Sequence, residues 1–399
     1  MASGLETLCG QAYGAQQYHK LGIYMYRAIF SLILVCIPIS FLWITMEKLL
    51  LFIGQDPLIS IEAGKFTLWM IPGLFAYAIA QPLMKFLQSQ SLILPMLISS
   101  VTTLCIHIPL SWFLVFKYDL GIVGAALSIS ISYLLYMFIL GSYIMCSVSC
   151  EPTRSKLSKG AFGGINGFLG IAFPSAVMIC LEYWSFELLI LMSGLLPNPD
   201  LETSVLSICL TTISLIYSIP YGLGAAASTR VSNELGAGNS KGACLAVRVV
   251  MFITVMEAVI VSIALFSTRY VLGYAYSSEK EVVDYVKAMV PLVCLSVFMD
   301  SLQGVLSGVA RGCGWQHLGA YVNLSAFYLV GIPTAILLGF RFHMRGKGLW
   351  IGILVGSTVQ TILLSLLTIF TNWQHQAKKA RELITKESSE NSTIESLLK

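Results

Sequence analysis

The sequence has few charged residues and lacks the motifs of common catalytic and metal sites. Asp, Glu, Lys and Arg make up 11% of its 399 residues, whereas an average soluble domain carries about 25%. The formal net charge is only +4 and no basic stripe is present, which excludes a nucleic-acid-binding protein and a disordered chain. The ten cysteines form no CxxC pair and no cluster with histidine, so no metal or other cofactor is expected. HExxH, a nucleophile elbow and paired catalytic carboxylates are also missing, which argues against an enzyme.

Long apolar runs are what the sequence has instead. Hydrophobic residues make up 56% of the chain and the mean hydropathy is +0.80, so the chain must dissolve mostly in lipid. A hydrocarbon core about 30 Å thick takes about 20 apolar residues in a helix, and backbone groups in lipid must be satisfied within the segment. The alternating pattern of barrel strands is absent. The predicted membrane-spanning helices are Ile23–Met46, Gly64–Met84, Leu92–Phe116, Gly121–Met145, Ile165–Gly194, Ser204–Ala227, Ala243–Ser267, Val283–Ser307, Leu318–Phe340 and Gly348–Thr371.

Lysine and arginine in the connections set the predicted orientation. The connection Glu151–Lys159 is basic, whereas Leu195–Thr203 contains Asp200 and Glu202 and no Lys or Arg. The tail, 372–399, adds further basic residues on the side of the basic connection. Because cytoplasmic loops carry the excess of positive charge, the sequence predicts a multi-pass membrane protein with a cytoplasmic tail.

The chain repeats itself at a nearly constant shift. Six predicted helices fit within this shift, so the two copies run parallel, as in some secondary transporters. The residue pairs separated by 221–225 positions are Thr7 and Thr229, Gly14 and Gly236, Ala15 and Ala237, Arg27 and Arg248, Gln81 and Gln303, Pro109 and Pro333, and Gly121 and Gly346.

The repeat also predicts an incomplete first copy. Two predicted helices, Ile165–Gly194 and Ser204–Ala227, precede Thr229, and their counterparts in the first copy would end near residue 5. We therefore expect an all-α polytopic fold with two pseudo-symmetric lobes, ten complete transmembrane helices of an ancestral twelve, and an N-terminally truncated chain. The predicted parts are an N-terminal lobe that lacks its first helix and most of its second (1–148), a cytoplasmic linker (149–163), a six-helix C-terminal lobe (164–371) and a polar cytoplasmic tail (372–399).

Acidic residues inside the predicted spans are the candidates for function, because a charge near mid-bilayer costs about 2.5–3.5 kcal/mol on insertion scales. The four acids, all in the second copy, are Glu182, Glu187, Glu257 and Asp300. The first-copy positions that match Glu257 and Asp300 are Val35 and Ala78, so the acid chemistry is one-sided. A carboxyl group kept from water can exchange a proton near neutral pH, which a proton-coupled carrier requires.

Glu182 lies near the centre of its predicted helix, with Tyr183 beside it and Phe186 on the same face. We predict that it couples protons or binds substrate; the alternative is a structural, hydrogen-bonded acid. Glu187 lies about 140° farther around the helix, so the two acids are not expected to face one narrow cleft. Glu187 and Tyr183 are kept as candidate site residues, with the structural interpretation preferred for Glu187.

Asp300 heads a polar stripe on an otherwise apolar helix. Gln303, Gly304 and Ser307 follow it at i+3, i+4 and i+7 and share its face. Asp300 and Gln303 are therefore candidates for coupling or substrate binding, and an interhelical hydrogen-bond network is the alternative. For Glu257, which has apolar neighbours, and for His107, a lone mid-membrane histidine, a packing role is preferred.

Two long motifs resemble signatures of the multidrug and toxic compound extrusion (MATE) transporters, in wording nearest to the plant DETOXIFICATION branch. They are LETLCGQAYGA at Leu5–Ala15, and PYGLG at Pro220–Gly224 followed by AASTRVSNELGAGN at Ala226–Asn239. Supporting segments are EYWSFE at Glu182–Glu187, SGLLPNP at Ser193–Pro199 and ARGCGWQ at Ala310–Gln316. The resemblance covers nearly the whole chain except the end of the acidic tail.

This resemblance implies two six-helix lobes around a central cleft and a secondary antiporter that exports or sequesters organic cations, xenobiotics or plant secondary metabolites in exchange for protons. The second-lobe acids of the family fall on Glu182 and Asp300. The implied partners are a small cationic or aromatic substrate, protons and the lipid bilayer, with no nucleic acid, and the protein is expected to be a monomer in the vacuolar or plasma membrane. The family's first helix has no counterpart among the predicted spans, so an incomplete first lobe is expected.

Three other interpretations remain open from the sequence. The chain could be a truncated, non-transporting form of such a carrier that binds an intact partner. A flippase for lipid-linked sugars of related fold would need a strongly cationic cleft, whereas the mid-span charges here are acidic. An integral-membrane enzyme lacks any motif in its support.

Overall fold

The computed structural model describes residues 1–155 and 164–397, with side chains as far as residue 385. Residues 156–163 of the predicted linker lie outside the described residues. The chain divides into two compact units: a first unit of Met1–Gly170 with Leu383–Lys399, and a second unit of Ile171–Glu382. The described residues contain ten helices long and apolar enough to cross a membrane. The all-helical fold and the ten predicted spans are thereby confirmed.

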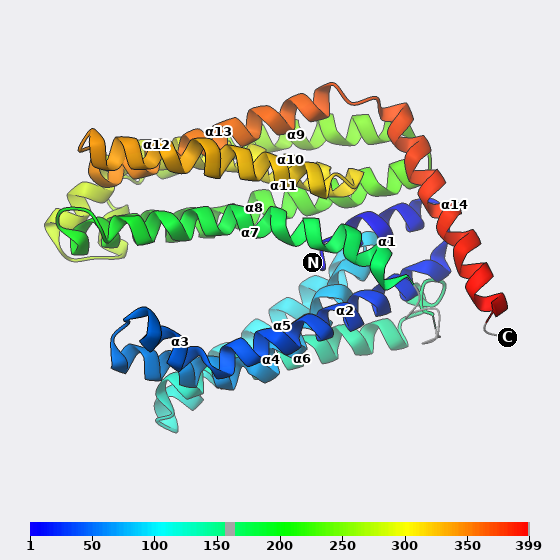
Figure 1. Ribbon diagram of the computed structural model, residues 1–399, viewed down its shortest axis with the longest axis horizontal. Coiled ribbons are helices and arrows are strands. Elements are labelled where there is room, and N and C mark those ends of the chain that lie inside the picture. The colour runs from blue at the N-terminus through cyan, green and yellow to red at the C-terminus, as the bar shows by residue number, and fades with distance from the viewer. Residues whose placement is uncertain (156–163, 398–399) are drawn as a thin grey trace. The chain divides into compact units, whose positions relative to one another are not determined.

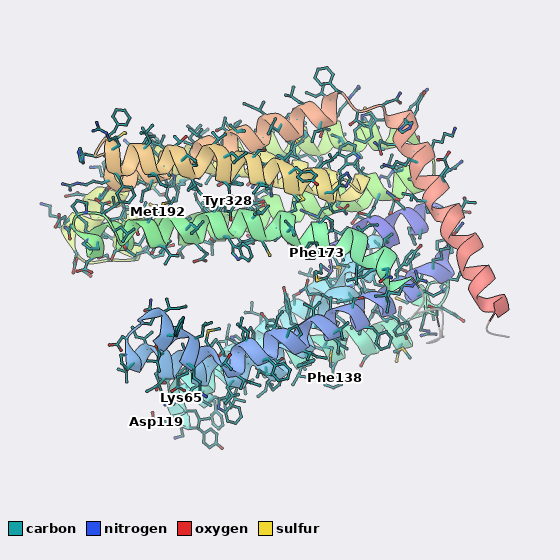
Figure 2. All side chains as sticks on the ribbon, in the orientation of Figure 1. Lys65, Asp119, Phe138, Phe173, Met192 and Tyr328 are labelled. Atoms are coloured by element: carbon teal, nitrogen blue, oxygen red, sulfur yellow. The ribbon has the colours of Figure 1, made fainter. Side chains whose placement is uncertain are left out.

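The first unit consists of long helices that run alongside one another (Figure 1). Lys65, early in its helix, and Asp119, in a turn, lie at one end of this unit (Figure 2). The elements are α1 (Gly4–Gly14), α2 (Tyr18–Ile44), α3 (Met46–Ile53), α4 (Pro57–Ser89), α5 (Ile93–Trp112), the π-helix η1 (Phe113–Lys117), α6 (Gly121–Cys146) and the 3₁₀-helix η2 (Val148–Cys150).

The second unit begins within α7 and ends within α14. Its long helices also lie side by side, with α10 next to α8, α9 and α13 (Figure 1). The elements are α7 (Ile165–Ser193), α8 (Pro199–Gly236), α9 (Ser240–Ser267), the 3₁₀-helix η4 (Leu272–Ala275), α10 (Lys280–Cys313), α11 (Gln316–Asn323), the π-helix η5 (Leu324–Gly331), α12 (Ile332–Ile336), the π-helix η6 (Leu337–Arg341), α13 (Arg345–Ile369) and α14 (Trp373–Leu397).

Several helices extend beyond the apolar stretches that predicted them. The predicted span Gly64–Met84 lies within α4, Pro57–Ser89. Asp56 caps this helix by accepting hydrogen bonds from the backbone N–H of Leu58 (2.8 Å) and Ile59 (3.3 Å), and Pro57 occupies a first-turn position that needs no donor. Hydropathy identifies the part of a helix that crosses lipid, whereas caps fix where the helix begins.

A stripe of glycines packs α10 closely against α8. Gly304, Gly308 and Gly312 recur at i+4 spacing on α10. A Cβ atom at Gly308 would overlap the backbone of Gly224, and one at Gly312 would lie 2.7 Å from the Ser228 carbonyl oxygen. Small residues allow such close approach in membranes, where helix association depends on packing. This contact fixes α10, and with it Asp300 and Gln303, against α8.

Candidate functional site

A cavity of about 380 Å³ lies within the second unit, between α7, α8 and α10. All five site residues predicted from the sequence border it. Its lining residues are Glu182, Tyr183, Phe186 and Glu187 of α7, Leu210, Thr211, Ile213, Ser214 and Tyr217 of α8, and Asp300 and Gln303 of α10.

Glu182 is held by an amide donor from the facing helix. Gln303 Nε2 donates a hydrogen bond to Glu182 Oε1 at 2.9 Å. Ser307 Oγ donates to Gln303 Oε1 at 3.5 Å, which orients the amide so that its nitrogen faces the carboxylate. Glu182 also interacts electrostatically with Arg311, which is only 7% exposed near the end of α10. The acid on α7 and the polar stripe on α10 therefore form one network.

Asp300 is buried, with 4% of its surface exposed. Ser357 Oγ of α13 donates a hydrogen bond to Asp300 Oδ1 at 2.9 Å. The predicted stripe of Asp300, Gln303 and Ser307 thus faces the interior of the second unit. Glu182 and Asp300 border one cavity and accept hydrogen bonds from a neutral amide and a neutral hydroxyl, with Arg311 as the cation that acts on Glu182.

The expectation that Glu182 and Glu187 cannot share a cleft is wrong. Both border the cavity, although Glu182 is partly buried and Glu187 is exposed. Five residues advance a helix by about 7.5 Å, so this cavity extends over more than one turn of α7 and is wider than the sequence suggested. Tyr183, also exposed, contributes its ring to the same wall.

The remaining two candidates lie elsewhere. Glu257 of α9 does not border this cavity and lies beside Ser301 of α10. In the first unit, His107 Nδ1 is 2.8 Å from Ser132 Oγ. Since Ser132 Oγ already donates to the Ser128 carbonyl (2.7 Å), it must accept from the histidine. The bond of His107 is compatible with the packing role preferred from the sequence, whereas both carboxylate oxygens of Glu257 are buried without a hydrogen-bond partner among the described residues.

Sequence reasoning missed several neutral polar residues at the site. Tyr217 lines the cavity and packs on Gly304, where a Cβ atom would lie 2.9 Å from Tyr217 Oη. Ser357 and Gln360 of α13 are buried and lie behind the acids. Their i, i+3 spacing inside an apolar run was the available signal, and it is weak because neutral polar residues in membrane helices commonly form structural interhelical hydrogen bonds.

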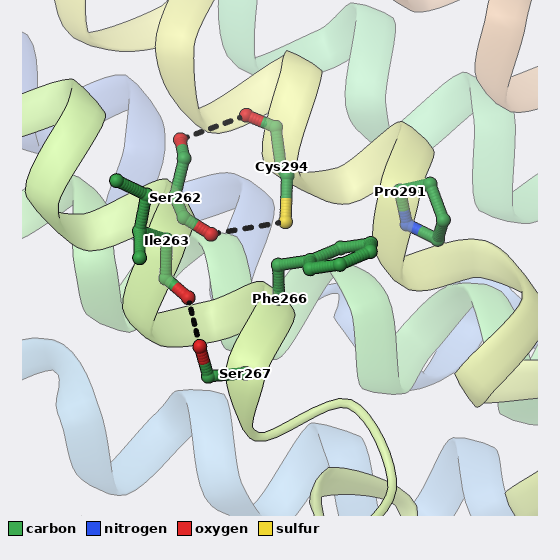
Figure 3. Close-up of a pocket in the computed structure, with 6 residues that line it drawn as sticks. All are labelled: Ser262, Ile263, Phe266, Ser267, Pro291 and Cys294. Carbon is green, nitrogen blue, oxygen red and sulfur yellow. Dashed lines mark hydrogen bonds between the residues drawn. The ribbon is translucent and has the colours of Figure 1, made fainter.

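A second cavity, of about 320 Å³, opens between α9 and α10 (Figure 3). Ser262 Oγ donates to the Cys294 carbonyl at 3.1 Å, and Cys294 Sγ donates to the Ser262 carbonyl at 3.5 Å. Pro291 and Phe266 form the rest of its wall with Ile263 and Ser267. The lining contains no acid, so this cavity offers no counter-charge to a cation or proton.

The chain is similar to known membrane transporters over nearly its whole length. The MatE family model matches residues 1–113 and 174–337. Protein DETOXIFICATION 12 of Arabidopsis thaliana is 58% identical over 381 residues, covering 96% of this chain and 79% of the relative. Protein DETOXIFICATION 14 of the same plant is 59% identical over 384 residues, with the same coverage.

Solved structures agree with these sequence relationships. The crystal structure of the eukaryotic MATE transporter AtDTX14 superposes with a TM-score of 0.92 at 59% identity, covering 96% of this chain and 86% of that one. A Vibrio cholerae MATE transporter, VcmN, matches with a TM-score of 0.79 at 16% identity over 94% of this chain and 85% of that one, which supports the fold alone. The chain therefore belongs to the MATE family of multidrug and toxic compound extrusion transporters.

Proposed function

We propose that this protein is a proton-coupled antiporter that exports or sequesters organic cations, with Glu182 and Asp300 as the groups that exchange protons for substrate. The observation that carries the proposal is that two carboxyl groups border one cavity and accept hydrogen bonds from neutral side chains. A carboxylate balanced by an amide or hydroxyl keeps a negative charge that a proton or a cation can neutralise.

Competition between the proton and the substrate provides the coupling. With both acids ionised, the cavity attracts a cation; protonation removes that charge and weakens cation binding. Linkage requires the effect to be reciprocal, so a bound cation also lowers the affinity for protons. A carrier that changes its facing between these two states exchanges one for the other.

The wall of the cavity is suited to flat organic cations. Tyr183, Phe186 and Tyr217 place aromatic rings beside the two acids, and a cation over an aromatic face is attracted by the ring. The volume of about 380 Å³ falls within the range of small-molecule sites. We therefore infer aromatic or quaternary cations as the substrate class, which includes xenobiotics and plant secondary metabolites.

The proton gradient supplies enough free energy for useful accumulation. If each exchange moves one net charge, a potential of 100 mV contributes about 2.3 kcal/mol, which sustains a substrate gradient of roughly fiftyfold. We place the tail in the cytoplasm, because the predicted topology puts it on the side of the basic connections. The vacuolar or plasma membrane is proposed from the resemblance to the plant branch of the family.

Exchange in proteoliposomes tests the proposal. Ethidium serves as the cation probe, an imposed pH gradient as the driving force, and a trapped pH dye reports proton movement. Glu182→Gln and Asp300→Asn should each lower pH-driven ethidium transport at least tenfold, because the amide cannot exchange a proton. Glu279→Gln, an exposed acid at the start of α10, is the matched control and should transport normally.

Two outcomes would overturn the proposal. Unchanged transport by both acid variants would remove Glu182 and Asp300 from the mechanism. Transport that follows an imposed sodium gradient and ignores the pH gradient would assign coupling to sodium. If the chain transports only when extended by the two helices expected upstream, the non-transporting interpretation of this form is favoured.

The flippase alternative has less support from the site. Among the described residues that border the cavity there are three acids and no lysine or arginine. A pyrophosphate-linked lipid would be repelled by this wall unless Arg311, close to Glu182, offset it. We therefore keep a cationic substrate as the proposal.

A further inference from the structure

Asn323 lies at a break in the helical pattern of the second unit. It is the last residue of α11 and precedes the π-helix η5. Single π-helical segments within α-helices occur frequently at functional sites. Its side chain has no exposed surface, so the Asn-Leu-Ser sequence at this position offers no acceptor for glycosylation. The Asn323 amide instead makes hydrogen bonds to buried groups of neighbouring helices.

The hydrogen bonds of Asn323 have a fixed direction. Asn323 Nδ2 donates to the Met178 carbonyl oxygen at 2.7 Å. Because a carbonyl can only accept, the orientation of the Asn323 amide is determined, and its Oδ1 must face Gln360. Gln360 Nε2 donates to that oxygen at 2.8 Å. Gln360 is also fully buried, and its amide orientation therefore follows from that of Asn323.

Both partners of Asn323 lead to Glu182. Met178 lies four residues before Glu182 on α7, so its carbonyl belongs to the helical turn that carries the acid. The Gln360 side chain lies near the Glu182 carboxylate, which Arg311 and Asp300 of α10 and Tyr217 of α8 also face. Asn323 itself does not border the cavity. One buried amide thus holds the backbone of Glu182 and one of its side-chain partners.

We propose that Asn323 is a positioning residue for Glu182, which fixes the α7 turn through the Met178 carbonyl and holds the Gln360 amide in one orientation near the carboxylate. This inference rests on the proposed function of Glu182. It adds to that function a residue, Asn323, that neither borders the cavity nor carries a charge.

The arrangement gives Glu182 two oriented amides. Gln303 is oriented by the Ser307 hydroxyl and Gln360 by Asn323. Amide donors favour the charged form of a carboxyl group, so the pair sets how readily Glu182 takes up a proton. Loss of Asn323 frees the Gln360 amide to rotate and present its oxygen, which favours the neutral acid.

The test measures the pH dependence of ethidium–proton exchange by the full chain in proteoliposomes. Asn323→Leu, similar in shape but unable to hydrogen bond, should move the half-maximal pH upward by about half a unit to one unit. Thr358→Val is the matched control on α13, because Thr358 Oγ1 bonds only to the Leu354 carbonyl of its own helix (2.7 Å). Its pH profile should match that of the unsubstituted protein.

A second set of variants keeps the test decisive if Asn323→Leu does not fold. Gln360→Met removes the donor and leaves Asn323 in place, and the double variant Asn323→Leu/Gln360→Met leaves neither amide unpaired. Both should show the same upward shift. Infrared difference spectra provide a substrate-free readout: the acid C=O stretch that disappears in Glu182→Gln should persist to higher pH in these variants.

The outcomes separate this inference from the proposed function. If Glu182→Gln transports normally, the role of Glu182 fails whatever the Asn323 variants do. If Glu182→Gln abolishes exchange while the folded Asn323 and Gln360 variants keep the original pH profile and infrared midpoint, Asn323 is structural and only the present inference is overturned.

Discussion

The two units of this protein treat buried charge differently. In the first unit, Lys85 Nζ of α4 lies 2.5 Å from Glu6 Oε1 of α1, with side chains 4% and 3% exposed. In the second unit, Glu182 and Asp300 accept hydrogen bonds from an amide and a hydroxyl. The first arrangement pairs the acid directly with a cation, whereas the acids of the second accept neutral hydrogen bonds and only Glu182 has a cation, Arg311, acting on it.

The sequence repeat makes this comparison specific. The shift of 222 positions that relates Gln81 to Gln303 carries Glu6 to Ser228 and Lys85 to Ser307, and carries Asp300 back to Ala78. Where one copy has an ion pair the other has two hydroxyls, and where one has an acid the other has a methyl group. Similar helices can therefore hold a buried ion pair or the acids to which we assign proton exchange, depending on a few polar substitutions.

The largest effect is expected from breaking the buried ion pair. Lys85→Met removes the lysine that is ion-paired with the buried Glu6, which costs about 3–5 kcal/mol. Thermal unfolding in detergent should show a marked drop in apparent Tm. The double variant Lys85→Met/Glu6→Gln should recover much of the loss. A single variant as stable as the unsubstituted protein would show that the pair contributes nothing to the first unit.

Disrupting the α8–α10 contact should come next. A methyl group at Gly308 overlaps the Gly224 backbone, so Gly308→Ala should destabilise the protein by about 1–3 kcal/mol. Gly222→Ala, also in α8 but with nothing within 4 Å of its added carbon, is the control. Equal melting temperatures for the two variants would contradict the close packing of α10 on α8.

A smaller effect concerns proton exchange. Ser357→Ala removes the hydroxyl that donates to Asp300. The charged form of Asp300 loses that support, so the half-maximal pH of ethidium–proton exchange should rise by about half a unit to one unit. Thr368→Val, buried in the same helix and bonded to its own Leu364 carbonyl at 2.8 Å, should leave the profile unchanged. A profile unaffected by Ser357→Ala would remove the serine from the coupling network.

The smallest effect should come from an exposed ion pair of the first unit. Lys65 Nζ and Glu62 Oε1 are 2.8 Å apart, with side chains 52% and 34% exposed. Glu62→Gln should cost well under about 1 kcal/mol, because solvent screens exposed charges. Comparison with Lys85→Met in the same melting assay measures how much more a buried ion pair contributes to stability than an exposed one. A drop as large as that of Lys85→Met would refute this ordering.

The helices and the two central acids could be predicted because both follow from the cost of placing polar groups in lipid. An apolar run long enough to span the bilayer must be helical. A carboxylate inside such a run is costly, so it indicates a functional role. The cleft geometry was not predictable: Glu187, which its angle from Glu182 was expected to keep out of a shared narrow cleft, still borders the same cavity. Helical angles relate residues on one helix. They contain no information about the distance to the neighbouring helices, which sets the width of the cavity.

The neutral residues around the acids show the same limit. Asn323, Ser357 and Gln360 come from α11 and α13, far from Glu182 in sequence, and each resembles an ordinary polar residue in an apolar run. Their roles depend on hydrogen-bond direction, which starts from the Met178 carbonyl and passes through two amides. Only atomic positions reveal that direction.

The amino-acid sequence by itself determined that this chain is a helical membrane protein with a repeated architecture and acids confined to the second copy, because lipid imposes strict rules on backbone and charge. Tertiary structure decided which side chains meet across helices. It brings Glu182 and Asp300 to one cavity and places oriented amides behind them, since interhelical distances arise from packing, such as the glycine contact of α8 and α10, that no single helix encodes.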